Sequence, residues 1–69
     1  MYKKWISVDK KLPDVVDGEL TSEDLLLYAS WKKVITIGYY DTYFNNFYDY
    51  STREYNYGIS HYTDLPKTP

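Results

Sequence analysis

The clearest element in the pattern of apolar and polar positions is the segment Val34–Asp41, which opens with a run of β-branched residues and continues into two tyrosines. β-branched and aromatic side chains are typical of strands, so the pattern predicts a strand here. Successive side chains of a strand point to opposite faces. If Tyr39 follows Ile35 and Ile37 into the core, Tyr40 lies on the other face of the sheet.

The segment before it, residues 21–33, is ambiguous between a helix and a strand. Thr21 and Asp24 are spaced as in a helix capping box that leads into three leucines, and this local chemistry favours a helix running to the end of the segment. As a strand, Leu25–Ala29 would point its side chains alternately to the two faces of a sheet, and residues 31–33 would form a hairpin turn. The β-branched run that follows favours this pairing, so both interpretations stay open here.

Weaker signals organise the rest of the chain. Residues 1–13 are predicted to form a short extended piece and a charged turn, and residues 14–21 a loop. Beyond the clear strand, Asn45-Asn46 indicates a turn, because asparagine tolerates left-handed backbone angles. The pattern then predicts a strand over residues 47–50, and after it a polar connection over 51–56.

A last strand over residues 57–63 completes the predicted sheet. The proline-containing tail, residues 64–69, is expected to be extended, with polyproline-like angles. Together the elements predict a mainly β fold, a single antiparallel meander of about four strands, in one small domain that spans residues 1–69. A small α+β fold is the alternative if residues 21–33 form a helix.

The composition shows how so short a chain closes a core. With 69 residues the core is marginal, and two Trp, ten Tyr and two Phe supply the large side chains that it needs. The absence of cysteine excludes disulfides and thiolate metal sites. No apolar stretch is longer than Leu25–Ala29, which predicts neither a membrane span nor a signal peptide and favours a soluble, cytoplasmic protein.

The charge pattern argues against nucleic-acid binding. The net charge is −2, and most basic residues stand in separated pairs. The aromatic-rich segment, residues 34–52, contains no lysine or arginine. Proteins that stack bases on aromatic rings combine the rings with a basic groove. A general DNA or RNA binder is therefore not expected.

An excess of aromatic residues is the most unusual feature of the chain. From Tyr39 to Tyr50, seven of twelve residues are aromatic, more than one small core can hide, so an exposed aromatic patch is expected. Tyrosine suits binding surfaces because it combines a large contact area with little rotamer entropy and a hydrogen-bonding tip. The candidate ligand- or partner-binding residues are Tyr40, Tyr43, Phe44, Tyr48, Tyr50 and His61.

His61 is the only histidine and the one candidate general base or phosphate partner, with Ser60 and Asp64 close in sequence. Within a strand, Ser60 and His61 point to opposite faces, so they are not expected to pair directly. The alternative is a structural histidine that packs on Trp5 and bonds a backbone carbonyl. No catalytic constellation is recognisable, and an enzyme is not expected.

The acidic residues of the first loop do not have the spacing of a metal site. Asp14, Asp17 and Glu19 lie within six residues but lack the pattern of a calcium-binding loop, which indicates a solvated acidic loop. The three glycines are isolated, so no phosphate-binding loop is present. Neither a metal nor a cofactor is expected.

Motifs at both ends of the chain, and two segments between them, resemble a known family. They are Trp5-Ile6-Ser7-Val8, Leu12-Pro13, Leu25-Leu26-Leu27-Tyr28, Gly38-Tyr39-Tyr40, Ile59-Ser60-His61-Tyr62, Leu65-Pro66 and Pro69. In this order they resemble the small phage and prophage proteins of the family called domain of unknown function 551. The chain departs from the family pattern at Tyr62, where the family has Trp, and at Thr63-Asp64, where it has Met-Pro.

The resemblance implies a strand at Leu25–Ala29 and a phage or prophage origin, and with it the cytoplasm of the host bacterium. It implies no activity. Together with the aromatic excess it leads to the hypothesis of a non-enzymatic accessory protein whose Tyr-rich face binds a host protein or a small aromatic, nucleotide-like ligand, in a counter-defence role. The alternatives are an assembly protein that forms a homo-oligomer through its aromatic face and a small hydrolase that uses His61.

Overall fold

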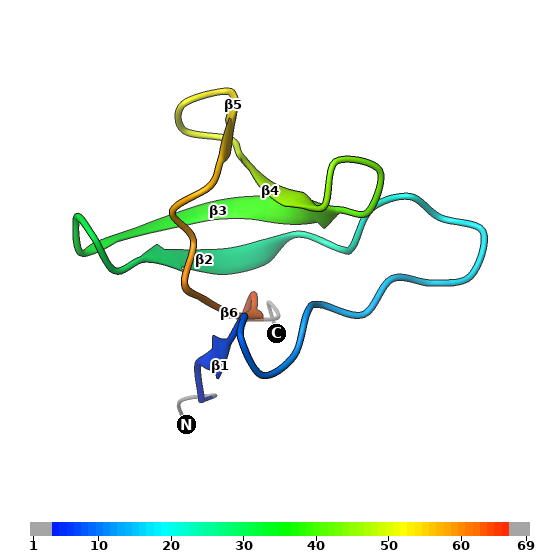
Figure 1. Cartoon of the computed structure of the whole chain (residues 1–69), viewed down its shortest axis with the longest axis horizontal. Helices are drawn as coiled ribbons and strands as arrows, with labels where there is room; N and C mark the ends of the chain where they lie inside the picture. Colours follow the sequence, from blue (N-terminus) through cyan, green and yellow to red (C-terminus); the bar gives the residue numbers. More distant parts are fainter. Residues whose placement is uncertain (1–3, 67–69) are drawn as a thin grey trace.

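The computed structural model describes residues 4–66 and shows one antiparallel sheet of six strands (Figure 1). The strands are β1 (Ile6–Ser7), β2 (Leu25–Ala29), β3 (Val34–Asp41), β4 (Asn46–Asp49), β5 (Glu54–Asn56) and β6 (His61–Asp64). Their order across the sheet is β1-β6-β2-β3-β4-β5. The predicted mainly β fold with a single antiparallel sheet is confirmed, with six strands in place of about four. The end of the predicted tail, residues 67–69, lies outside the described residues.

Residues 21–33 do not form a helix. Leu25–Ala29 is strand β2, which pairs with β3 on one side and with β6 on the other. Ser22, at the start of the expected helix, accepts the N–H of Tyr40 at 2.9 Å and donates to the carbonyl of Glu23 at 2.8 Å. The helix interpretation is wrong because two ladders satisfy the backbone of β2, a hairpin ladder to β3 and a long-range ladder to β6, and they outweigh a local capping signal.

Three turns link β2 to β5 as a meander, and each holds one non-glycine residue with a positive φ. These residues are Lys33 (53°), Asn45 (52°) and Arg53 (58°). Of the turn predicted at Asn45-Asn46, the position of Asn45 is confirmed, whereas Asn46 is the first residue of β4. The predicted polar connection over residues 51–56 is wrong in its second half: the N–H of Arg53 donates to the carbonyl of Asp49 at 2.8 Å, and the chain reverses there to form β5 on the edge of β4.

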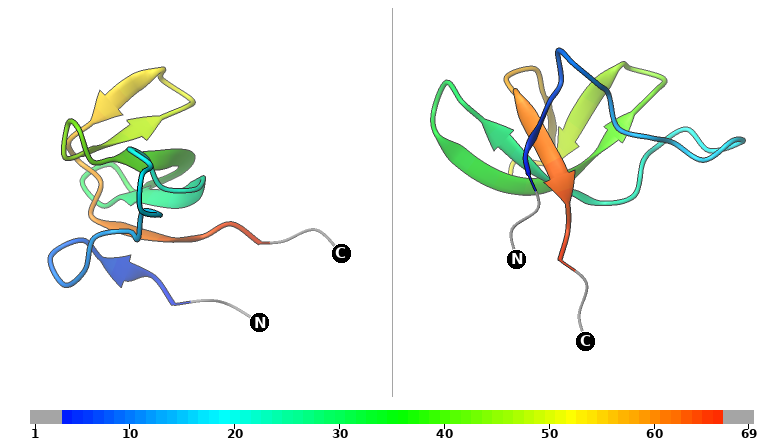
Figure 2. Two further views of the ribbon diagram at one scale, coloured as in Figure 1. Left: turned by 90° about the vertical axis from the view of Figure 1, so that its right-hand side faces the viewer. Right: turned by 90° about the horizontal axis from the view of Figure 1, so that it is seen from below.

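The last strand begins at His61 and not at residue 57. Residues 57–60, here called the crossover, carry the chain from β5 at one edge to β6, which lies between β1 and β2 (Figures 1 and 2). Pairing with β2 starts only where the N–H of Ser60 donates to the carbonyl of Tyr28 at 2.9 Å. Gly58 lies against the indole of Trp31, where a Cβ atom would overlap the ring. The sheet is therefore a meander of β2, β3, β4 and β5, and the chain then returns to add β6 along the free edge of β2.

The core lies on one face of the sheet, here called the inner face. Its buried apolar residues are Leu25, Leu27, Ala29, Tyr40, Phe47 and Tyr62, joined by Ile59 of the crossover. Val8 and Val15 of the N-terminal segment pack against this cluster. The opposite, outer face of the sheet is therefore left to the alternate side chains of the same strands.

The side chains of β3 point to the opposite faces from those predicted. Tyr40 is buried, with 4% of its surface exposed, whereas Ile35 and Ile37 are 58% and 44% exposed on the outer face. The register places Thr36 and Gly38 opposite two leucines of β2 on the inner face. Small side chains of β3 thus meet large ones of β2. If β3 faced the other way, its isoleucines would lie opposite these leucines and overfill the core.

Candidate functional site

The outer face carries a group of aromatic side chains, here called the outer aromatic cluster. Its members are Tyr39, Tyr43, Phe44, Tyr48, Tyr50 and Tyr55. Three of them, Tyr39, Tyr48 and Tyr55, stand in register on β3, β4 and β5. The ring centroids of Tyr39 and Tyr48 are 5.2 Å apart in a stacked arrangement, and those of Tyr48 and Tyr55 are 5.3 Å apart and edge-on. Cross-strand ring pairs of this kind hold one another in place.

The exposed part of the cluster comes from the ends of β3 and β4. Phe44, in the turn between these strands, lies 4.9 Å from Tyr55 and 4.8 Å from Tyr43 between ring centroids. Tyr50, after β4, lies 5.7 Å from Tyr39. Tyr43, Phe44 and Tyr50 are 73%, 55% and 45% exposed. The cluster thus has a half-buried base of stacked rings and a solvent-facing border of three aromatic side chains.

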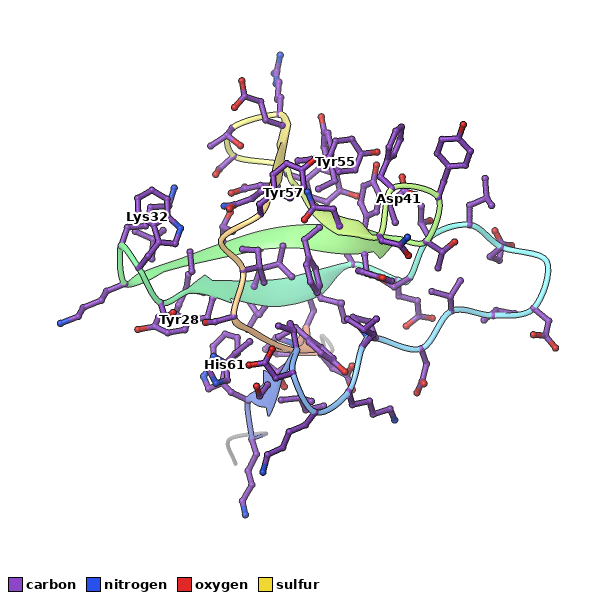
Figure 3. The ribbon with its side chains drawn as sticks, viewed as in Figure 1. Tyr28, Lys32, Asp41, Tyr55, Tyr57 and His61 are labelled. Carbon is purple, nitrogen blue, oxygen red and sulfur yellow. The ribbon has the colours of Figure 1, made fainter. Side chains whose placement is uncertain are left out.

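Two hydroxyl groups of the cluster are anchored to carboxylates. Tyr50 donates to Oδ1 of Asp24 at 2.7 Å. Tyr55 donates to Oδ2 of Asp41 at 2.8 Å, and both residues are labelled in Figure 3. The bond to Asp24 raises the pKa of Tyr50 to about 12, and the bond to Asp41 raises the pKa of Tyr55 above its ordinary value. Both phenols are therefore neutral at physiological pH. Asp41 also accepts the N–H of Tyr43 at 2.9 Å, which fixes the turn that presents the exposed rings.

A shallow depression of about 250 Å³ lies on the same face, between β1 and β3. It is lined by Trp5, Tyr28, Ile35 and His61. The ring of Tyr28 lies 5.9 Å from that of Trp5 and 6.1 Å from that of His61, and Figure 3 shows Tyr28 beside His61. The depression is mostly aromatic and aliphatic, with the imidazole, the phenol and the indole N–H as its polar groups, so it suits one flat ring.

Ser60 and His61 are in direct contact, contrary to expectation. Nδ1 of His61 lies 2.8 Å from Oγ of Ser60, and the same hydroxyl lies 3.2 Å from the carbonyl oxygen of Tyr28. The prediction that the two side chains cannot pair is wrong because β6 begins at His61. Ser60 therefore belongs to the crossover, where side chains do not alternate as they do in a strand.

The structure brings together four of the six predicted binding residues: Tyr43, Phe44, Tyr48 and Tyr50 all belong to the outer aromatic cluster. Tyr40 does not belong to a binding surface; its ring is buried on the inner face, 5.1 Å from that of Phe47, and that prediction is corrected. His61 lies apart from the cluster, in the depression.

Sequence reasoning missed Tyr39 and Tyr55 at the base of the cluster. The predicted facing of β3, with Tyr39 in the core, is wrong: Tyr39 lies on the outer face, stacked on Tyr48. Tyr55 falls in the predicted polar connection. Glu54–Asn56 alternates polar and aromatic residues, but three residues are too few for this alternation to predict a strand by itself.

The electrostatics and donor set of the site limit its chemistry. The segment that supplies most of the cluster, residues 34–52, contributes carboxylates but no cationic side chain. Within residues 4–66, no three histidine, aspartate or glutamate side chains come together as they would to hold a metal ion. The same residues contain no helix of the length and apolarity needed to cross a membrane. What the outer face offers is flat, neutral aromatic surface.

Comparison with known proteins adds no relative. No family model matches the chain, and neither the curated proteins nor the solved structures contain a match. The resemblance to domain of unknown function 551 stays a prediction.

Proposed function

We propose that this chain is a non-enzymatic binding protein and that the outer aromatic cluster is the surface on which it binds a partner protein. The observation that carries the proposal is the exposure of Tyr43, Phe44 and Tyr50 at the border of a cluster whose rings are held by stacking at the base and by two anchored hydroxyls, one at the base and one at the border. A surface that is rigid before binding loses little entropy when a partner docks.

The shape and charge of the cluster favour a protein over the other partners. It extends over β3, β4, β5 and the turn between β3 and β4, which is broader than a site for one small molecule. Aromatic side chains are enriched where proteins meet, and anionic nucleic acid would meet no cation along residues 34–52. With the phage or prophage origin that the motif resemblance implies, the proposed partner is a host protein in the bacterial cytoplasm, and the proposed role is counter-defence.

The test compares two variants that each replace three exposed apolar side chains. The outer-face variant carries Tyr43→Ser, Phe44→Ser and Tyr50→Ser; the control carries Leu12→Ser, Leu20→Ser and Tyr57→Ser, which are similarly exposed but lie outside the cluster. A partner purified with the unaltered chain should bind the outer-face variant about a hundredfold more weakly, because a loss of about 1 kcal/mol at each of the three aromatic residues adds up to about 3 kcal/mol. The control should bind normally. Equal loss in both variants, or in neither, would reject this surface.

A second copy of the chain is the competing occupant of the same face. Sedimentation velocity distinguishes the two: a partner-binding face predicts a monomer at all concentrations. A dimer that the outer-face variant abolishes would replace the proposal with a homo-oligomer.

Hydrolysis remains a second candidate function because of the contact between Ser60 Oγ and His61 Nδ1. A serine becomes a nucleophile when its hydroxyl donates to a histidine. The carbonyl of Tyr28 competes for the same proton, so the pair has a purely structural alternative. Turnover of p-nitrophenyl acetate that is lost in both Ser60→Ala and His61→Ala would establish a hydrolase. Equal background rates in the unaltered chain and the two variants would rule out this function.

A further inference from the structure

The exposed border of the outer aromatic cluster is too small to form a complete protein interface. Tyr43, Phe44 and Tyr50 expose between 45% and 73% of their surface, which leaves roughly 350 Å² of ring surface if a whole aromatic side chain offers about 200 Å². A stable interface of standard size covers about 800 Å² on each partner. A protein that docks on the cluster must therefore cover other parts of the chain as well.

Exposed apolar surface continues from the cluster along β3. Tyr39, at the base of the cluster, is preceded on the same face of the strand by Ile37 and then by Ile35, and both isoleucines are exposed. Tyr50, at the border, donates its N–H to the carbonyl of Ile37 at 3.0 Å, so these two residues are neighbours. The isoleucines thus extend the apolar surface of the cluster toward β2.

This apolar surface leads into the depression between β1 and β3. Ile35, Tyr28 and His61 stand in register on β3, β2 and β6. The ring of Trp5 lies 5.9 Å from that of Tyr28 and completes the lining. Because Ile35 is both exposed on β3 and part of the lining, the cluster and the depression belong to one continuous apolar surface.

The depression has the size and the lining for one uncharged aromatic side chain. Its volume of about 250 Å³ exceeds the roughly 150 Å³ that is enough for a benzene molecule in an apolar protein cavity. Three of its four lining residues carry rings, which attract a further ring edge to face. None of the four is acidic, so a lysine or arginine side chain would lose its water there without gaining a carboxylate partner.

We propose that the partner protein covers the outer face from the cluster to the depression and inserts one aromatic side chain into the depression. This inference rests on the proposed function, because it assigns a further part of the surface to the same partner. Binding energy is concentrated in large side chains, tryptophan and tyrosine above all, that fill pockets of the other protein. The cluster then supplies contact area, and the depression selects a partner that carries a ring at the matching position.

Substitutions at two neighbouring positions of β3 test the extension of the interface. Ile35→Ser removes one wall of the depression. Val34→Ser is the matched control, because it removes a β-branched side chain of similar exposure from the inner face. In isothermal titration with the purified partner, Ile35→Ser should weaken binding about tenfold and Val34→Ser less than twofold. Equal affinities of the two variants would overturn the extension.

Filling the depression tests the inserted side chain. Ile35→Trp adds apolar surface to the outer face, but its own ring would occupy the depression, so it should weaken partner binding at least as much as Ile35→Ser. Unchanged or tighter binding would show that the partner lies over a flat surface and inserts nothing. Micromolar binding of free indole, or a dimer of the chain that Ile35→Ser abolishes, would assign the depression to a small molecule or to a second copy and would also overturn the proposal.

The outer-face variant, titrated in the same series, separates the failure of this inference from the failure of the proposed function. Loss of binding in both the outer-face variant and Ile35→Ser is the expected result. If the outer-face variant loses the partner and Ile35→Ser retains it, the partner binds the cluster alone, so the extension is wrong and the proposed function stands. If the outer-face variant retains the partner, the proposed function is rejected and this inference with it.

Discussion

Asp49 is the least exposed polar side chain among the described residues, with 2% of its surface exposed. Its Oδ1 atom accepts hydrogen bonds from the hydroxyl of Thr36 at 2.7 Å, the hydroxyl of Ser51 at 2.7 Å and the N–H of Ser51 at 2.9 Å. Burial alone would raise the pKa of Asp49, but these bonds outweigh it, and the pKa lies below its ordinary value of 3.8. The ionised carboxylate therefore stabilises the turn from β4 to β5.

Replacing this carboxylate should produce a pH-dependent loss of stability. Because the pKa is lower in the folded state, the contribution of Asp49 is complete above the pKa of the unfolded chain and is lost as the pH falls below about 4. We expect Asp49→Asn to lower the free energy of unfolding by about 2 kcal/mol at neutral pH. Urea unfolding should show the difference shrinking in acid; a difference that stays constant down to about pH 2.5 would contradict this role.

The site residues that the sequence could identify are those whose exposure follows from local composition. Tyr43, Phe44 and Tyr50 lie in or beside turns, where a large ring has no core to enter. Tyr39 and Tyr40 are adjacent and chemically alike, so only the register of β3 against β2 decides which of them is buried. That register depends on how Gly38 and Thr36 fit against the leucines of β2. This fit cannot be predicted from the local sequence of β3.

At the scale of single elements, strands with strong local signals were predictable and strands defined by their partners were not. Val34–Asp41 has the bounds expected from its β-branched and aromatic run. Leu25–Ala29 reads locally as a helix and becomes a strand through pairing with β6, more than thirty residues away. Glu54–Asn56 has three residues and exists as a strand only because β4 offers an edge.

Gly38 allows β3 and β4 to approach each other closely. A Cβ atom at this position would overlap the backbone carbonyl of Tyr48, which cannot move without distorting β4. We expect Gly38→Ala to lower the free energy of unfolding by about 3 kcal/mol. Gly58→Ala is the comparison, because its Cβ would meet the exposed indole of Trp31, which can rotate away, and about 1 kcal/mol is expected. Thermal unfolding followed by circular dichroism should rank the variants in this order; the reverse order would contradict the close approach.

At the scale of the whole molecule, the chain has more aromatic side chains than its core accommodates. The sequence has fourteen aromatic residues, and the buried core of the described chain includes three, Tyr40, Phe47 and Tyr62. Most of the others gather on the outer face, where they stack on one another. The result is a neutral aromatic surface on the outer face of the sheet.

Hydroxyl-radical footprinting of the chain, alone and with its purified partner protein, tests the central claim most directly. Tyr43, Phe44 and Tyr50 should be oxidised in the free chain and protected in the complex, because they form the exposed border of the binding surface. Tyr40 and Phe47 should stay unlabelled in both states and serve as internal controls. Exposed rings on the outer face that remain equally oxidised in the complex would contradict the account.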